Sequence, residues 1–292
     1  MGPSRIRSSR IRTLHRFGPA ALAAVLLAGC GTSGPPAATD APSVIHSTAH
    51  SRAHGAAVTL PPAHAGFDYQ IGGAYPPPTG VQVVSRDREA DPAAGLYNIC
   101  YVNAFQAQPG AQGDWDADLL LRQADTSIVM DRDWNEALLD LSTAAKRQRV
   151  AAKVNGLIDG CAAKGFQAIE PDNFDSYTRS QGLLTENDAQ AFIRLLSAHA
   201  HERGLAIGQK NTAELARAHV SNGLDFAVAE ECGALDECAE YTAAFGSEVL
   251  VIEYTSQGLA KACAEWGGRL SIVQRDKDVS AAGSGGYVRR PC

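Results

Sequence analysis

Short apolar segments alternate with helical segments along most of this chain, and this alternation constrains the fold more than any other feature. A helix is expected over residues 144–164, where apolar residues recur three and four apart. A second helix is expected to follow Thr185, a suitable N-cap, and to end near Arg203, before Gly204. Eight strands are expected, at Phe67–Ile71, Tyr97–Val102, Leu138–Leu141, Ala168–Glu170, Leu205–Gln209, Phe226–Glu230, Glu248–Glu253 and Arg269–Val273.

Strands that alternate with helices indicate parallel strands with the helices outside them. Residues 66–292, which contain the eight strands, have the length of a small barrel of roughly 200–250 residues. We therefore predict an α/β fold, a (β/α)8 TIM barrel in a single domain. The alternative is an open doubly wound sheet, but no Gly-x-Gly-x-x-Gly turn opens a helix after a strand.

The first 29 residues have the pattern of an export signal. Five arginines precede an apolar stretch at 19–28 that is too short to span a bilayer. The sequence Leu27-Ala28-Gly29-Cys30 resembles the lipobox of bacterial lipoproteins, in which the cysteine is acylated. We expect residues 1–29 to be a lipoprotein signal peptide, with a plain secretory signal as the alternative. The protein would then be lipid-anchored to the outer face of the cytoplasmic membrane, or secreted, and would touch the membrane only through its lipid.

Residues 30–65 are rich in small and polar residues and have few large apolar ones. Such a segment buries too little surface to offset its ordering entropy, so we expect a disordered tether. His46, His50, His54 and His64 lie in it without a cysteine among them. We expect solvated side chains there rather than metal ligands.

Six cysteines follow the lipobox, an even number that indicates three disulfides in an exported domain. Cys232 and Cys238 flank a short loop and form the best-supported pair. Bonding Cys263 to Cys292 would hold the C-terminus, which leaves Cys100 and Cys161 as the third pair. Since no Cys-x-x-Cys spacing exists, zinc-binding or catalytic cysteines are disfavoured.

The formal charge is −6, and removing the five arginines of residues 1–29, which contain no acid, leaves −11. This excess of acids argues against nucleic acid and anionic lipid as partners and suits a neutral or cationic ligand.

Polar residues gather where the expected strands end. Glu170 and Asp172 are two apart in the segment 166–175, so both leave the same face of an extended backbone. Barrel enzymes keep their chemistry at the carboxyl ends of strands, and burying unpaired carboxylates is costly. We therefore interpret these ends as a ligand site. Its expected substrate-binding residues are Asp68, Gln70, Tyr101, Glu170, Asn173, Lys210, Asn211, Glu253 and Tyr254.

Glycoside hydrolysis suits such a site because it needs two carboxyls across the scissile bond and neither a metal nor a cofactor. Asp172 and Glu230 end the fourth and sixth expected strands, which would let them face each other across the barrel mouth. They are the candidate catalytic pair.

Three of the neighbouring charged residues have structural alternatives. Asp175 would cap a helix, and Glu231 would be a solvated loop acid. Lys210 would pair with Glu170 or Glu230 and hold that carboxylate ionised, rather than touch substrate.

The chain resembles glycoside hydrolase family 114, the endo-α-1,4-polygalactosaminidases. The resemblance rests on ordered motifs at Phe67–Gly72, Ile99–Tyr101, Leu139–Leu141, Gly165–Asn173, Leu184–Thr185, His201–Leu205, Gln209–Asn211, Phe226–Cys232 and Ile252–Tyr254. It implies a (β/α)8 barrel in which Asp172 is the nucleophile and Glu230 the acid/base of a retaining mechanism. It also implies that Glu170, Asn173, Lys210 and Tyr254 line the pocket.

The substrate implied by this resemblance is a polymer of galactosamine, whose free amines are cationic. The expected function is therefore hydrolysis of an α-1,4-linked galactosamine-rich polysaccharide by a monomeric, endo-acting enzyme. The alternatives are a carbohydrate-binding lipoprotein without turnover and a glycosidase for a different amino-sugar polymer.

Overall fold

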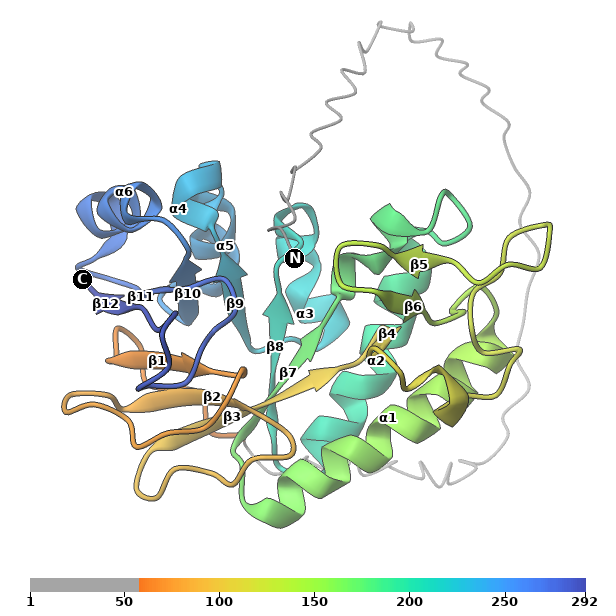
Figure 1. Ribbon diagram of the computed structural model, residues 1–292, viewed down its shortest axis with the longest axis horizontal. Helices are drawn as coiled ribbons and strands as arrows, with labels where there is room; N and C mark the ends of the chain where they lie inside the picture. Colours follow the sequence, from red (N-terminus) through yellow and green to blue (C-terminus); the bar gives the residue numbers. More distant parts are fainter. Residues whose placement is uncertain (1–57) are drawn as a thin grey trace, which may run out of the picture. The chain divides into compact units, whose positions relative to one another are not determined.

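The computed structural model describes residues 58–292, so the predicted signal peptide, Cys30, His46, His50 and His54 lie outside the described residues. A curved sheet of eight parallel strands forms the centre of this part (Figure 1). In spatial order the strands are β1 (Phe67–Gln70), β2 (Val83–Asp87), β3 (Tyr97–Asn103), β7 (Ala168–Asp172), β8 (Ala206–Lys210), β9 (Phe226–Glu230), β10 (Val249–Glu253) and β11 (Ser271–Arg275).

A ninth strand, β12 (Arg289–Pro291), pairs antiparallel with β11 at the end of the sheet. The two ends of the sheet approach each other there, since Arg289 of β12 donates to the Phe67 carbonyl of β1 at 3.0 Å. The result is a nearly closed barrel, as the alternation of strands and helices predicts.

One expected barrel strand is wrong and another is missing from the prediction. Leu138–Leu141 is buried, but its first residue belongs to β6 (Glu136–Leu138) of a separate antiparallel sheet with β4 (Gln106–Ala107) and β5 (Met130–Asp131). The missed barrel strand is β2. No helix separates β2 from β1 or β3, so the strand–helix alternation on which the prediction relied is absent there.

The helices follow the later strands. The α-helices are α1 (Ala144–Lys164), α2 (Glu186–Glu202), α3 (His219–Asn222), α4 (Cys232–Leu235), α5 (Cys238–Phe245) and α6 (Ser256–Trp266). The 3-10 helices are η1 (Gln112–Asp114), η2 (Phe174–Arg179) and η3 (Ala213–Ala218). Thr185 and Asp188 form a reciprocal capping box at the start of α2, which confirms the predicted N-cap. Gly204, at φ 72°, follows the helix.

Every second side chain along each barrel strand points into the barrel, and these side chains pack together as an inner cluster. Phe67, Ile99 and Phe226 are among the buried residues of this inner cluster. Gly208 lies on β8 where a Cβ atom would come within 2.7 Å of the Phe226 ring, so a side chain there would displace that ring. The barrel interior away from the carboxyl ends of the strands is therefore a packed core and not a pore. Ligand binding is confined to the ends of the strands.

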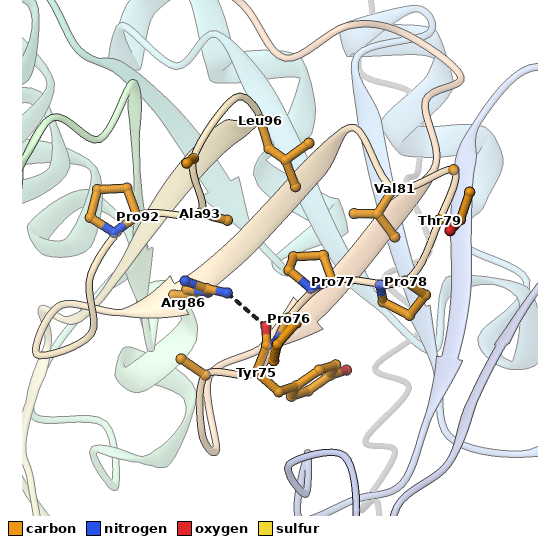
Figure 2. A pocket seen from close by; sticks show the side chains of 13 residues that line it. Tyr75, Pro76, Pro77, Pro78, Thr79, Val81, Arg86, Pro92, Ala93 and Leu96 are labelled. Carbon is orange, nitrogen blue, oxygen red and sulfur yellow. Dashed lines mark hydrogen bonds between the residues drawn. The ribbon is translucent and has the colours of Figure 1, made fainter.

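The outer face of β2 is covered by loops rather than by helices. The connections before and after this strand border an open hollow of about 570 Å³ lined by Tyr75–Val81, Arg86 and residues between Pro92 and Leu96 (Figure 2). Arg86 fixes one wall of this hollow by donating a hydrogen bond to the Tyr75 carbonyl at 2.8 Å. None of the predicted catalytic or substrate-binding residues lines this hollow.

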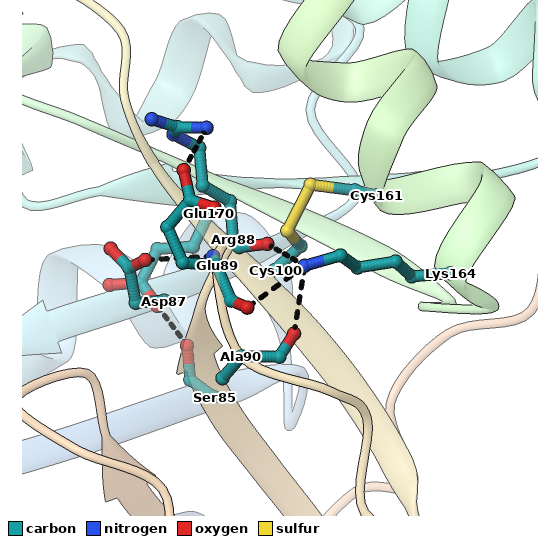
Figure 3. Close-up of a disulfide and its surroundings, with 9 residues drawn as sticks. All are labelled: Ser85, Asp87, Arg88, Glu89, Ala90, Cys100, Cys161, Lys164 and Glu170. Atoms are coloured by element: carbon teal, nitrogen blue, oxygen red, sulfur yellow. Dashed lines mark hydrogen bonds and ion pairs between the residues drawn. A yellow bond between two sulfur atoms is a disulfide. The ribbon is translucent and has the colours of Figure 1, made fainter.

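Residues 58–292 form three disulfides, with the pairing expected from the sequence. Cys100–Cys161 joins β3 to α1, Cys232–Cys238 joins α4 to α5, and Cys263–Cys292 holds the C-terminus on α6. Beside the first bond, Lys164 donates to the carbonyls of Arg88, Glu89 and Ala90, which fastens the end of α1 to the β2–β3 connection (Figure 3).

The folded unit begins before Gly66, the boundary expected from the sequence. Ala65 donates its backbone N–H to Ser271, Tyr97 donates to the Thr59 carbonyl at 2.6 Å, and the His64 ring contacts the Gly267 carbonyl at 2.8 Å. Residues 58–65 are therefore part of the folded unit rather than of the tether. Among the described residues, no helix combines the length and apolarity that crossing a bilayer requires.

Candidate active site

The predicted site lies at the carboxyl ends of the parallel strands, above the apolar core. On β7, Ala168 packs in the inner cluster and Ile169 in the larger cluster outside the barrel. Because side chains alternate along a strand, Glu170 and Asp172 also face inward. The same alternation turns further polar residues inward. The inward-facing polar residues are Tyr69, Ser85, Tyr101, Glu170, Asp172, Lys210, Glu230 and Tyr254.

Lys210 is the centre of this group. Its Nζ lies 3.2 Å from Glu170 Oε1, 3.1 Å from Asp172 Oδ1 and 3.4 Å from Glu230 Oε2. Only 2% of its side chain is exposed. Burial favours the neutral amine, but the surrounding carboxylates outweigh it and hold the pKa of Lys210 well above its ordinary value. The site therefore has a permanent cation between three acids.

Asp172 is held by two donors. Tyr101 donates its hydroxyl to Oδ2 at 2.7 Å, and Lys210 contacts Oδ1. Burial favours the protonated carboxyl, but Lys210 and Tyr101 outweigh it, so the pKa of Asp172 is lowered. The Asp172 side chain remains 20% exposed. Asp172 is thus an ionised carboxylate that a ligand can reach.

Glu230 is held on the other side of Lys210. Asn211 donates to Oε2 at 2.9 Å and accepts from the Glu230 backbone N–H at 2.8 Å. Tyr254 donates its hydroxyl to Oε1. The side chain is 23% exposed, similar to Asp172. Both carboxylates therefore contact one ammonium group, from the two strands that flank β8.

Glu170 lies deeper and has no exposed surface. Tyr69 donates to Oε1 at 2.7 Å and Ser85 to Oε2 at 2.6 Å, in addition to the contact with Lys210. Burial raises the pKa of Glu170, against the opposing effect of Lys210 and these two hydroxyls. Its position suits support of Lys210 rather than direct contact with a ligand.

The backbone is left-handed directly after three neighbouring barrel strands. Asn173 follows β7 at φ 67°, Asn211 follows β8 at φ 51°, and Glu231 follows β9 at φ 59°. Residues other than glycine adopt this conformation at an energetic cost, and such residues gather at functional sites. Here the turns place Asn173 beside Asp172 and Asn211 against Glu230.

The chemistry that this geometry permits is acid/base and nucleophilic catalysis by two carboxyls. A glycosidic bond placed over Lys210 would lie between Asp172 and Glu230. The sequence profile of glycoside-hydrolase family GH114 matches residues 47–292. The chain belongs to family GH114. It is therefore a glycosidase, as its motifs indicated.

Two solved structures have the same fold. The structure of Aspergillus fumigatus Ega3 in complex with galactosamine has 22% identity and a TM-score of 0.66, covering 82% of this chain and all of that one. The glycoside hydrolase domain of PelA from Pseudomonas aeruginosa has 15% identity and a TM-score of 0.51, covering 75% of this chain and 96% of that one. No curated protein sequence matches the chain.

Three residues expected to bind substrate in this GH114 barrel have no exposed surface and lie outside the inward-facing group. Asp68 and Gln70 alternate with Tyr69, so they point away from the barrel interior. Asp68 accepts hydrogen bonds from Gln70 and Tyr75 and pairs with Arg289 at 3.2 Å. Their predicted place in the substrate site is therefore wrong. Side chains alternate along a strand, so a polar residue at a strand end faces the pocket only if it points inward.

Glu253 is the third such residue. It is buried on the outer side of β10, where it accepts the backbone N–H of Gly233 at 2.7 Å. Cβ atoms at Gly233 and Gly258 would come within 2.9 and 2.2 Å of its carboxylate oxygens. Glu253 therefore joins α4 and α6 to the barrel and does not reach the pocket.

The residues predicted to bind substrate did not include Tyr69, Ser85 or Glu136. Tyr69 was visible between two polar residues, and the period of two along a strand separates it from them. Ser85 lies on the barrel strand that was not predicted. Glu136 lies on the separate sheet and accepts from Asn173 at 3.3 Å, a contact that no local pattern announces.

The three charged residues with structural alternatives also have defined places. Asp175 forms a two-pronged ion pair with Arg179, at 2.7 and 2.9 Å, within η2. Glu231 is partly exposed in the turn after β9. Lys210 pairs with all three inward-facing acids, as its alternative assignment anticipated in part.

Proposed function

We propose that this GH114 glycosidase hydrolyses an α-1,4-linked, galactosamine-rich polysaccharide, cleaving within the chain and retaining the anomeric configuration. Family membership and the similarity to a protein solved with galactosamine support the substrate class. The excess of acids, in the whole chain and around Lys210, supports a cationic polymer because it lowers the energy of a bound ammonium group.

In this mechanism Asp172 is the nucleophile. Its lowered pKa keeps it ionised, and Tyr101 and Lys210 hold it in place for attack on the anomeric carbon. Glu230 donates its proton to the leaving oxygen as the glycosidic bond breaks, which produces a sugar ester of Asp172. Glu230 then takes a proton from water, and the resulting hydroxide attacks the same carbon and releases the ester.

The contacts of Lys210 carry this assignment. One ammonium nitrogen contacts Asp172 at 3.1 Å and Glu230 at 3.4 Å, so the two contacted oxygens lie no farther apart than these lengths combined. Retaining enzymes separate their carboxyls by about 5–5.5 Å and inverting enzymes by about 6.5–9.5 Å. The combined length reaches only the lower limit of the inverting range, which supports retention.

The test is the release of reducing ends from de-N-acetylated galactosamine polymer by the wild type and by Asp172→Asn and Glu230→Gln. Each substitution is expected to lower kcat by at least about 1,000-fold, since it removes a group that acts in the transition state. Glu231→Gln is the matched control beside Glu230, and we expect it to keep activity. Full activity in either catalytic variant, or an inactive control beside an active Glu230→Gln, would refute the assignment.

Proton NMR of the first product released separates the two stereochemical outcomes. An α-configured reducing end before mutarotation is expected for retention, and a β-configured one would mean inversion.

We also propose that the protein is exported and anchored through a lipid on Cys30. The lipobox-like sequence Leu27–Cys30 supports this. Three disulfides in the folded part agree with it, because disulfides persist in oxidising compartments outside the cytosol.

A further inference from the structure

A second polar cluster borders Asp172 and is not used by the mechanism. It centres on Glu136, the first residue of β6, whose side chain is partly buried. Asn173 donates to Glu136 Oε2 at 3.3 Å and to Asn103 Oδ1 at 3.0 Å. Asn173 directly follows Asp172, and Asn103 pairs with Asp172 in the β3–β7 ladder. The cluster therefore adjoins the proposed nucleophile, on the side of the small sheet.

Asn103 is a buried donor that faces Glu136. It is 7% exposed, and its Nδ2 is closed to solvent. An amide N–H removed from water loses free energy unless something accepts its hydrogen bond. Glu136 is the acceptor on which Asn103 acts, and this contact favours the charged form of that carboxyl. Asn103 therefore supports Glu136 and is not itself open to a ligand.

Arg179, a cation that acts on Glu136, is already paired with other acids. Arg179 forms its ion pairs with Asp175 and with Asp131, the latter at 2.8 Å. With its amide nitrogen turned toward Glu136, Gln106 donates to Oε2 at 2.8 Å and accepts from Arg179 at 3.1 Å. These neighbours position the Glu136 carboxylate, and within residues 58–292 no lysine or arginine forms an ion pair with it.

The charged groups around Glu136 also favour the binding of a cation there. The pKa of Glu136 is raised to about 7, mainly by burial and in addition by the negative charges of Asp172 and Asp131. Asn103 and Arg179 act in the opposite direction. A bound ammonium group would reverse the balance, because an opposite charge at hydrogen-bonding distance stabilises the carboxylate.

We propose that Glu136, held by Asn103 and Asn173, forms a subsite beside Asp172 that selects a sugar unit with a free amino group. Its partly exposed carboxylate accepts a hydrogen bond from the ammonium group of a 2-amino-2-deoxy sugar. N-acetylation removes the positive charge of the amino group and adds an acetyl group, which needs more space. This inference rests on the proposed function and names the residues that would set its preference.

Turnover gives the first test, with Glu136→Gln in the full-length protein. The glutamine keeps an oxygen for Asn173, so the fold and Asp172 should be preserved. A hydrogen bond to a charged group contributes enough that KM for de-N-acetylated galactosamine polymer should rise about 10- to 100-fold. We expect kcat to change less than about threefold, since the lost contact is made equally in ground and transition states. The preference over partly acetylated polymer should fall by the same factor as KM rises.

The pH dependence distinguishes recognition from a structural role. In the wild type, KM should rise as the pH falls through about 7, because the raised pKa lets Glu136 become protonated there. Glu136→Gln should lose this rise. Glu265→Gln on the exposed surface of α6 is the matched control, with the same change of charge, and should behave as the wild type. Equal losses of kcat on both polymers would instead mean that Glu136 only positions Asp172, and would overturn the proposal.

Calorimetric titration tests the subsite without turnover. A galactosamine tetrasaccharide should bind the Glu230→Gln variant at least about tenfold more tightly than the N-acetylated tetrasaccharide, and adding Glu136→Gln should remove the difference. If this discrimination is found but the wild type releases no reducing ends, the proposed hydrolysis is refuted and the subsite is kept. Equal affinity for both tetrasaccharides would overturn the subsite whether or not hydrolysis occurs.

Discussion

Replacing Lys210 by Met removes the one cation that three inward-facing acids share. Methionine has nearly the length of lysine, so the change removes charge and hydrogen bonds rather than volume. Glu170 would keep its two hydroxyl donors but lose its only contact with a cation, while remaining completely buried. Asp172 and Glu230 would keep their partial exposure to water.

Removing one partner from a buried ion pair costs about 3–5 kcal/mol because it leaves an uncompensated charge. We expect a loss of this size near neutral pH. For a domain of this length, each kcal/mol lowers Tm by roughly 2–4 °C, so the melting temperature should fall by roughly 6–20 °C.

The loss should depend on pH in a definite direction. In the wild type the pKa of Asp172 is lowered, so its contribution to stability is present above the ordinary aspartate pKa and disappears as the pH falls through the lowered value. The pKa of Glu170 is raised, and without Lys210 it should rise further, so the variant's Glu170 is stabilised by protonation. The gap between wild type and variant should therefore shrink in acid.

The assay is urea unfolding followed by circular dichroism, at about pH 7.5 and about pH 3, with disulfides intact. Lys261→Met is the control, because Lys261 forms an ion pair with Asp236 in which both side chains are largely exposed. Such surface pairs contribute about 0–1 kcal/mol. If Lys210→Met loses no more than the control, or loses equally at both pH values, the buried charges are not coupled as described.

Two further predictions concern the outer packing and the N-terminus. Gly258→Ala should destabilise the protein by about 1–3 kcal/mol in thermal unfolding, because its Cβ would come within 2.2 Å of the buried Glu253 carboxylate. Gly160→Ala on α1 has open space and should stabilise by about 0.5–1 kcal/mol, and the reverse order would contradict the packing argument. Labelled fatty acid should appear on the wild type and be absent from Cys30→Ala, whereas persistent label in the variant would rule out that lipid anchor.

Local patterns predicted the elements whose causes are local. Thr185, Asp188 and Gly204 mark the ends of α2, and the structure has the helix where these residues place it. The disulfide pairing followed from the even number of cysteines and the short loop between Cys232 and Cys238. Strand β2 was missed because its neighbours along the chain are loops, so no helical segment marked its ends.

The site was predictable as a location but not as a set of side chains. Glu170, Asp172, Lys210 and Glu230 end parallel strands, and parallel strands bring such ends together. Asp68 and Glu253 looked equivalent in the sequence, yet the period of two turns them outward, against Arg289 and Gly233. One residue of register separates a pocket residue from a structural one.

What the amino-acid sequence determined by itself was the kind of fold and the two acids proposed for catalysis, because both follow from short motifs at the ends of strands. What only the tertiary structure decided was the sharing of Lys210 among three carboxylates and the approach of Glu136 to Asn173 beside Asp172. These contacts join segments far apart in sequence, and their energies depend on burial and on distances of a few ångströms. Neither quantity exists until the chain has folded.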